Sequence, residues 1–257
     1  MAKRLWTRDE MILTLALYFQ LPFGRLNHTS PEVRDLASLL NRTNNAVALR
    51  LVNFAACDPY IINSGRSGMS GGLNICLPYW NEYANDKEAL FLEAESIRNR
   101  MMNRTFEQSL KIDSSQMLGL DKMAFVKQRV NQNAFRTMIL NNYNFHCAIT
   151  GISIPELLIA SHIIPWAMNK KERLNPENGI CLSSLYDKAF DKGFISIDKN
   201  NKIILADKLK VYKDADFYAT HFACIENQPI RLPEEHMPDP QFLEWHRDCI
   251  FNKNTTT

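Results

Sequence analysis

The chain has 257 residues, of which 46% are hydrophobic and 23% are charged. It can therefore bury a full core in one or two domains. The 30 Lys and Arg residues nearly balance the 28 Asp and Glu residues, so the overall charge carries no nucleic-acid signature and any phosphate-binding surface must come from local clustering. The apolar stretch at residues 11–19 follows Asp9 and Glu10 and is too short to span a bilayer. We expect a cytoplasmic protein without a membrane segment.

The first hundred residues predict a separate helical module. Thr7 and Glu10 have the spacing of a capping box at the start of a first helix, and Pro31 lies in the first turn of a second. The polar residues 41–45 interrupt the pattern before a third helix that includes Phe54. We therefore expect three helices with a short turn before the last.

The third helix of this module carries the candidates for DNA contact. The sequence resembles a helix-turn-helix of the Myb or homeodomain kind in Trp6-Thr7, in Leu36-Ala37 and in Arg42-Thr43-x-x-Ala46-Val47. In such modules, polar residues near the start of the last helix touch bases and phosphates. The resemblance implies that Arg42, Asn44, Asn45 and Arg50 contact DNA. A plain three-helix bundle that touches no DNA is an equal alternative.

A glycine-rich segment follows at residues 63–74, with four of the nine glycines of the chain. We expect a flexible loop or hairpin that could close on a phosphate backbone through Arg66, and a surface connector is the alternative. Residues 86–100 predict a further helix, and a polar connection comes after it. We place the domain boundary near residue 115, which gives a helical module at residues 1–115 and a second domain at residues 116–257.

The second domain begins with a predicted helix at residues 125–143 that has one basic edge. Such a helix could deliver cations to DNA phosphates, and Arg136 is the best single candidate on it. A solvated helix face is the more common explanation of any one arginine.

Near the centre of the chain, a histidine closes an apolar run at residues 157–166. Asn178 follows His162 and precedes Gly179, where a turn should reverse the chain into a second strand. Asp187 and Asp191 then lie four residues apart on a predicted helix, so they share one face and can hold a hard cation. A histidine at a strand end can take a proton from water. This order of strand, turn, strand and helix predicts a one-metal nuclease site.

These residues resemble the HNH endonucleases, whose ββα-metal unit has a general-base histidine on its first strand. Four matches carry the resemblance to a bacterial subgroup of that family: Cys147-Ala148-Ile149-Thr150-Gly151, His162-Ile163-Ile164-Pro165, Asn178-Gly179 and Phe190-Asp191-Lys192-Gly193. The resemblance implies that His162 is the general base and that Asn178 supports the loop beside it. It also implies that Asp187 and Asp191 face the metal. Bacterial proteins of this layout often serve in restriction or defence.

Two departures from the family pattern bear on the metal. After Asn178 the next histidine is His221, so a carboxylate must replace the third histidine of the motif, and carboxylates favour Mg²⁺ or Mn²⁺. Ser161, a poor metal ligand, precedes the base where many relatives carry His or Asp. An aspartate pair on a solvated, salt-bridged helix face is the alternative for Asp187 and Asp191. Of the two, Asp187 is the better candidate ligand, because Asp191 could instead brace the turn at Gly193.

No structural zinc is expected. The six cysteines are isolated and form no Cys-x-x-Cys pair, and their scatter fits single thiols in a reducing compartment.

After the site, residues 194–205 alternate as a hairpin around Asn200 and Asn201, and residues 242–247 predict a closing helix. The expected fold is thus α+β, with a helix-turn-helix-like module followed by a ββα-metal nuclease domain. The expected activity is metal-dependent hydrolysis of double-stranded DNA. A DNA-binding regulator with a degenerate, inactive HNH fold is the alternative, and the sequence leaves a homodimer open.

Overall fold

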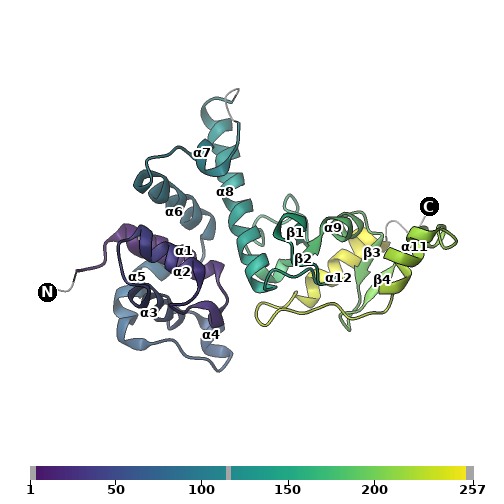
Figure 1. Ribbon diagram of the computed structural model, residues 1–257, viewed down its shortest axis with the longest axis horizontal. Helices are drawn as coiled ribbons and strands as arrows, with labels where there is room; N and C mark the ends of the chain where they lie inside the picture. The colour runs from purple at the N-terminus through teal and green to yellow at the C-terminus, as the bar shows by residue number, and fades with distance from the viewer. Residues whose placement is uncertain (1–3, 114–116, 253–257) are drawn as a thin grey trace. The chain divides into compact units, whose positions relative to one another are not determined.

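The computed structural model describes residues 4–113 and 117–252. Its fold is α+β, as expected: a helical N-terminal region is followed by two short hairpins with further helices (Figure 1). Contacts divide the chain into two compact units, Met1–Ala134 and Phe135–Thr257, and the division falls inside the long helix α8 (Gly119–Asn142). Residues 114–116 lie outside the described residues, so the domain boundary near residue 115 stays a prediction.

No helix within the described ranges is long and apolar enough to cross a membrane.

The N-terminal unit begins with the three predicted helices, α1 (Arg8–Gln20), α2 (Pro31–Leu39) and α3 (Asn44–Ala55), with a 3₁₀ turn at Phe23–Arg25 after the first. The capping box of α1 is present, since Thr7 Oγ accepts a hydrogen bond from the Glu10 N–H and the Glu10 carboxylate accepts one from the Thr7 N–H. Pro31 begins α2, where its missing N–H leaves no helical bond unmade. The core of the unit includes the buried side chains of Met11, Ile12, Leu15, Leu36, Leu51 and Phe54.

The glycine-rich segment does not form a hairpin. It runs from α4 (Pro59–Asn63) through a 3₁₀ turn (Ser70–Gly72) into α5 (Leu73–Tyr83). Asn53 Nδ2 donates to the Met69 carbonyl at 2.8 Å, which ties the segment to α3. A Cβ on Gly68 would lie 2.2 Å from the backbone nitrogen of Ala56, and one on Gly72 would lie 2.2 Å from Asn53 Oδ1. Both glycines therefore permit close packing against α3.

The helix predicted at residues 86–100 is α6 (Lys87–Met101), capped by Asp86, whose side chain accepts from the Ala89 N–H. The short helix α7 (Phe106–Leu110) follows, and α8 then covers the helix predicted at residues 125–143.

The second unit contains the two predicted strands and the predicted helix, but a loop at residues 163–175 separates the strands, and Gly179, which was predicted to lie in the reversing turn, is the first residue of the second strand. Strand β1 (Leu158–His162) pairs antiparallel with β2 (Gly179–Ser183), with Ser161 opposite Ile180 and His162 opposite Gly179. A 3₁₀ turn precedes each strand, at Pro155–Leu157 and at Pro176–Asn178. Helix α9 (Ser184–Asp191) follows β2 directly and packs on both strands (Figure 1).

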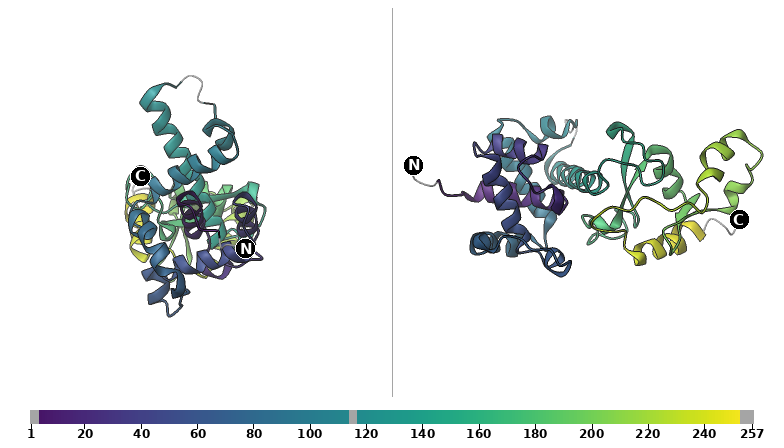
Figure 2. Two further views of the ribbon diagram at one scale, coloured as in Figure 1. Left: turned by 90° about the vertical axis from the view of Figure 1, so that its left-hand side faces the viewer. Right: turned by 60° about the horizontal axis from the view of Figure 1, so that its bottom comes forward.

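The rest of this unit consists of a second hairpin and further short helices. Strands β3 (Ile195–Ile197) and β4 (Ile203–Leu205) form the hairpin predicted at residues 194–205, and Asn201 takes a φ of 58° in its turn. Helices α10 (Asp207–Lys210) and α11 (Asp216–His221) and a 3₁₀ turn (Ala223–Ile225) follow. The predicted closing helix is α12 (Pro240–His246), which continues as a π-helical turn (Arg247–Phe251) and lies against β3 (Figure 2).

Candidate active site

His162 ends β1 and is held by three neighbours. Its ring stacks on Phe135 of α8, with 3.7 Å between the ring centroids and 15° between the planes. Trp166 meets the ring edge-on at 5.5 Å and 86°. His162 Nε2 lies 3.1 Å from the carbonyl oxygen of Arg173. Burial lowers the pKa of His162 to about 4, so the imidazole is neutral at neutral pH.

The contact with Arg173 determines which ring nitrogen of His162 is basic. A carbonyl oxygen can only accept a hydrogen bond, so the proton of the neutral ring lies on Nε2, which donates to the Arg173 oxygen. The lone pair is then on Nδ1. The site therefore presents a neutral imidazole with one defined proton-accepting nitrogen.

Asn178 holds the loop that carries these neighbours. Its Oδ1 accepts from the Ile164 N–H at 2.8 Å, and its Nδ2 donates to the carbonyls of Ile164 and Glu172 at 3.2 and 3.1 Å. Asn178 is buried, with 1% of its surface exposed. One amide therefore joins Ile164, near the start of the loop after β1, to Glu172, the residue before Arg173.

Asp187 and Asp191 lie together on α9. Burial raises the pKa of Asp187 above its ordinary value, and the nearby Ser161 hydroxyl opposes that rise. For Asp191, partial burial of the carboxyl and then the negative charge of Asp187 raise the pKa. Ser161 is only 2% exposed, and its Oγ has no well-formed hydrogen bond to any described residue. The site thus gathers two carboxylates and a buried hydroxyl that lacks a regular partner.

The predicted base and the predicted metal ligands lie on different faces of the hairpin. Successive side chains of a strand point to opposite faces. Ser161 accordingly lies near Asp187 of α9, and His162 stacks on Phe135 of α8. The two groups are therefore joined through adjacent residues of β1, and His162 makes no hydrogen bond to either aspartate among the described residues.

The oxygen donors near Ser161 suit a hard cation. Mg²⁺ is commonly bound through one or two carboxylates, with waters and substrate phosphate completing its octahedral shell. Asp187 and Asp191 provide such a pair, and the Ser161 hydroxyl is a further oxygen with unused capacity. Within the described ranges, no three His, Cys, Asp or Glu side chains gather closely enough to hold a metal by themselves.

The Cys147-to-Gly151 motif forms a turn beside the hairpin. Cys147 Sγ accepts from the N–H groups of Thr150 and Ser183 at 3.4 and 3.1 Å, and the Ala148 N–H donates to the Cys181 carbonyl at 2.7 Å. Gly151 takes a φ of +71°, which glycine adopts without strain. All six cysteines are free thiols. In this turn a thiol accepts backbone hydrogen bonds and fixes the turn to β2.

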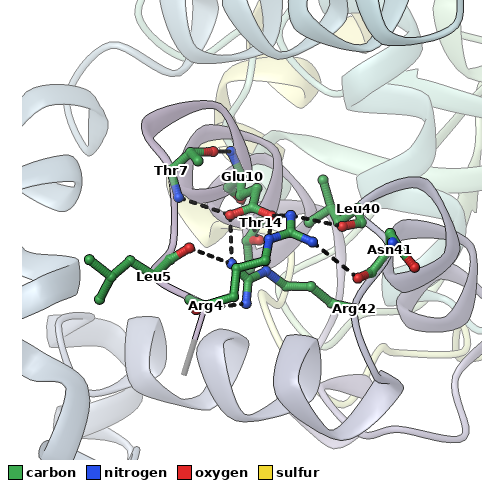
Figure 3. A network of polar contacts seen from close by, with 8 residues as sticks. All are labelled: Arg4, Leu5, Thr7, Glu10, Thr14, Leu40, Asn41 and Arg42. Atoms are coloured by element: carbon green, nitrogen blue, oxygen red, sulfur yellow. Dashed lines mark hydrogen bonds and ion pairs between the residues drawn. The ribbon is translucent and has the colours of Figure 1, made fainter. Parts of the chain in front are cut away.

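Arg42 belongs to an internal ion-pair network (Figure 3). Its Nε and Nη2 donate to the two carboxylate oxygens of Glu10 at 2.9 and 2.8 Å, and the Arg42 and Glu10 side chains are only 9% and 5% exposed. Arg4 also pairs with Glu10, and the Arg42 guanidinium lies 4.2 Å from the centroid of the Trp6 ring. These contacts tie the chain before α1 to the start of α3. We therefore leave Arg42 out of the proposed DNA contacts.

Two further arginines also serve internal contacts. Arg50 lies over the Trp6 ring at 5.0 Å, and its Nη1 approaches Cys76 Sγ at 3.8 Å. Arg136 donates to the carbonyls of Leu158 and Pro155 at 2.5 and 2.7 Å, which clamps the start of β1 to α8. Both guanidiniums thus make contacts within the protein, and contact of Arg50 and Arg136 with DNA stays a prediction.

The remaining candidates are accessible and stay predictions. Asn45 is exposed and Asn44 half-buried in the first turn of α3, after the N-cap Thr43. Arg66 is exposed, with its guanidinium 5.7 Å from the Phe23 ring.

Sequence reasoning missed Trp166 and Arg173. Arg173 Nε donates to the Trp166 carbonyl at 2.8 Å, and its guanidinium lies 4.9 Å from the Trp166 ring centroid. The decisive contact to His162 comes from a backbone carbonyl, which any residue type carries. Only the nearness of an aromatic residue to the histidine could have drawn attention to Trp166.

The family model of the HNH endonucleases matches residues 147–198, a range that includes His162, Asn178, Asp187 and Asp191. No curated protein matches the chain. The matched range begins at the Cys147 turn and ends after β3, so it covers the β1–β2 hairpin and α9.

Proposed function

We propose that the protein is a metal-dependent endonuclease that hydrolyses phosphodiester bonds in double-stranded DNA, because residues 147–198 match the HNH endonuclease family model. One observation carries the proposal: His162 is a neutral imidazole with its proton committed to a carbonyl and its lone pair on Nδ1. A general base for water needs that protonation state and a fixed ring. The subgroup that the motifs resemble supports a role in restriction or defence.

His162 acts as the general base in this proposal. Its Nδ1 takes a proton from the water that attacks phosphorus, and the ring becomes positively charged. The Arg173 carbonyl accepts the Nε2–H, and this contact favours the charged ring. Asn178 keeps that carbonyl in place through its bond to the adjacent Glu172.

Asp187 and Asp191 would hold the cation, with the Ser161 hydroxyl as a further oxygen near Asp187. A bound Mg²⁺ or Mn²⁺ supplies Lewis-acid stabilisation of the charge on the phosphate and the leaving 3′-oxygen. Three exposed lysines supply positive charge for the DNA backbone: Lys188 beside Asp187 on α9, and Lys170 and Lys171 on the loop after β1.

Cleavage of supercoiled plasmid tests the proposal, with Mg²⁺, with Mn²⁺ and with excess EDTA, on methylated and unmethylated DNA. We expect cleavage only with a divalent metal. His162→Ala should lower the rate by about 10²- to 10⁴-fold, the usual contribution of a general base. His221→Ala, which changes an exposed histidine of the same unit, is the matched control. Cleavage by His162→Ala at the wild-type rate, or full activity in EDTA, contradicts the mechanism.

A DNA-binding regulator with an inactive HNH fold is the second candidate. The observation that favours it is the small ligand set, since two carboxylates and a serine replace the histidine-rich set of the family, and no larger acidic or histidine cluster occurs among the described side chains. This candidate predicts plasmid binding without cleavage, together with no measurable Mn²⁺ binding in calorimetry.

A further inference from the structure

Trp166 and Arg173 lie on the loop after β1 and contact each other. Arg173 Nε donates to the Trp166 carbonyl at 2.8 Å, and the guanidinium lies over the Trp166 ring, 4.9 Å from its centroid. A planar guanidinium can stack on an aromatic face and donate in its own plane at the same time, which a lysine ammonium cannot do. One side chain therefore fixes both the backbone and the ring of Trp166.

Both Trp166 and Arg173 touch His162. The Trp166 ring packs edge-on against the imidazole at 5.5 Å, and the Arg173 carbonyl receives the Nε2–H at 3.1 Å. The third contact of the ring, the stacked Phe135, comes from α8. Stacking on Phe135 fixes the plane of the imidazole but permits a half-turn about the Cβ–Cγ bond, which keeps that plane and exchanges the positions of the ring nitrogens. The edge contact with Trp166 and the Arg173 carbonyl favour one of these two orientations and therefore determine which nitrogen faces the substrate.

We infer that the Arg173 side chain and Trp166 form a brace that positions His162 and keeps its proton on Nε2. Arg173 is a positioning residue here, because it acts through Trp166 and through its own carbonyl. The inference deepens the proposed function and rests on it, since a fixed Nδ1 matters only if His162 accepts a proton.

A phosphate contact is the competing role for Arg173, because an arginine beside a nuclease site commonly binds the DNA backbone. The two roles differ in measurable ways. A phosphate contact acts on DNA affinity and on its salt dependence, and a lysine retains much of it. A brace acts on the imidazole in the absence of DNA, and a lysine does not restore it.

Nitrogen-15 NMR of the full chain, without DNA and without metal, reads the tautomer of His162 directly. We expect the wild type to show one neutral form, with the proton on Nε2. Arg173→Ala should shift the proton partly to Nδ1, and Arg173→Lys should do the same although it keeps the charge and most of the stem. Lys171→Ala, an exposed cation of the same loop, is the matched control and should leave the signals unchanged. Wild-type signals in Arg173→Ala overturn the inference.

Coupling between the two residues gives a second, independent measure. Trp166→Leu should shift the tautomer in the same direction, and the double variant with Arg173→Ala should add little further, because both changes remove one shared contact. Additive shifts overturn the brace. If Arg173→Ala unfolds, as judged by circular dichroism, Arg173→Lys and Trp166→Leu carry the test.

A DNA-cleavage assay distinguishes failure of the brace from failure of the proposed function. If the wild type cuts DNA, Arg173→Ala and Arg173→Lys should each lower kcat by about 10²-fold with DNA affinity nearly unchanged, since a small displacement of a reacting group has such an effect. A loss confined to DNA affinity, with rescue by lysine, assigns Arg173 to a phosphate contact. If the wild type does not cut DNA, the proposed function fails, and the NMR result still decides whether the brace exists.

Discussion

Asp187 and Asp191 occupy one face of α9 but differ in their surroundings. Asp187 is partly buried next to the Ser161 hydroxyl, whereas Asp191 lies at the end of the helix, where its carboxyl is also partly covered but more of the residue is exposed. A carboxylate that already lies in a partly buried position loses less hydration and less freedom when it binds a cation. The first aspartate should therefore contribute more to metal binding than the second.

We predict that Asp187→Asn weakens Mn²⁺ binding by about tenfold or more, whereas Asp191→Asn weakens it less. Calorimetric titration of the full chain without DNA measures both affinities. Asp214→Asn, an exposed aspartate elsewhere in the same unit, controls for the loss of one negative charge. Equal affinity in the wild type and Asp187→Asn would move the ligand role to other residues.

At the scale of elements, the packing of α8 against the hairpin depends on Gly179. This glycine pairs with His162 across the two strands. A Cβ at this position would lie 2.3 Å from Ile139 Cδ1 and 2.7 Å from Phe135 Cζ, both on α8. Phe135 is also the ring on which His162 stacks, so overpacking here displaces the histidine together with the helix.

We predict that Gly179→Ala destabilises the protein by about 1–3 kcal/mol, the usual cost of forcing extra volume into a packed core. Urea unfolding measures this change. Gly24→Ala is the control, because a Cβ at Gly24 meets no atom within 4 Å. Unfolding midpoints that agree in the two variants would show that α8 moves aside without cost.

Sequence patterns within a few residues predicted most of these elements. Features that depend on contacts between residues far apart in the sequence were not predicted. The spacing of Thr7 and Glu10 determined the start of α1, because a capping box lies within one turn. Helix α5 escaped prediction because it follows two glycines and contains Pro78. The role of Arg42 was equally hidden, since its partner Glu10 lies 32 residues away and nothing near Arg42 indicates an ion pair.

The same distinction holds at the site. The motif order identified His162, Asn178 and the two aspartates as residues to examine, and the matched family range includes all of them. Strand alternation predicts that neighbouring side chains of β1 point to opposite faces, but it does not predict which element covers each face. The proton position on His162 required the Arg173 carbonyl, which has no side-chain signature in the sequence.

For the molecule as a whole, buried neutral histidines make stability depend on pH. His246 is fully buried, donates from Nε2 to the Phe190 carbonyl at 3.1 Å and accepts at Nδ1 from the Ser196 hydroxyl at 2.9 Å. Burial lowers its pKa to about 4 from the ordinary 6.5. The unfolded chain thus takes up a proton in a pH range where the folded chain does not. The contribution of the buried neutral His246 to the free energy of unfolding is therefore complete above pH 6.5 and is lost as the pH falls towards 4.

We predict that the free energy of unfolding falls by about 2 kcal/mol through this one histidine when the pH is lowered from about 7.5 to about 5. Urea unfolding at the two pH values measures the loss. His246→Gln should be less stable at the higher pH and should lose less on acidification. His221→Ala should behave as the wild type, because His221 is exposed. Parallel losses in His246→Gln and the wild type would contradict the assignment.

The N-terminal unit offers a test that separates its own stability from DNA recognition. Arg42 is buried in the network with Glu10 and Trp6, whereas Asn45 is exposed in the first turn of α3. Removing one partner of a buried ion pair leaves an uncompensated charge. An exposed amide makes no such contribution to the fold and is free to pair with an adenine edge in the major groove.

We predict that Arg42→Ala destabilises the chain by about 3 kcal/mol, with an unchanged preference among DNA sequences, and that Asn45→Ala retains stability but discriminates less between sequences. Thermal unfolding and fluorescence anisotropy at two salt concentrations measure the two effects. The full chain carries His162→Ala in these experiments so that the DNA stays intact. Ser38→Ala on α2, which changes an exposed polar side chain, is the control. If Asn45→Ala binds every duplex as the parent does, α3 is not the recognition helix, and target choice lies in the HNH domain.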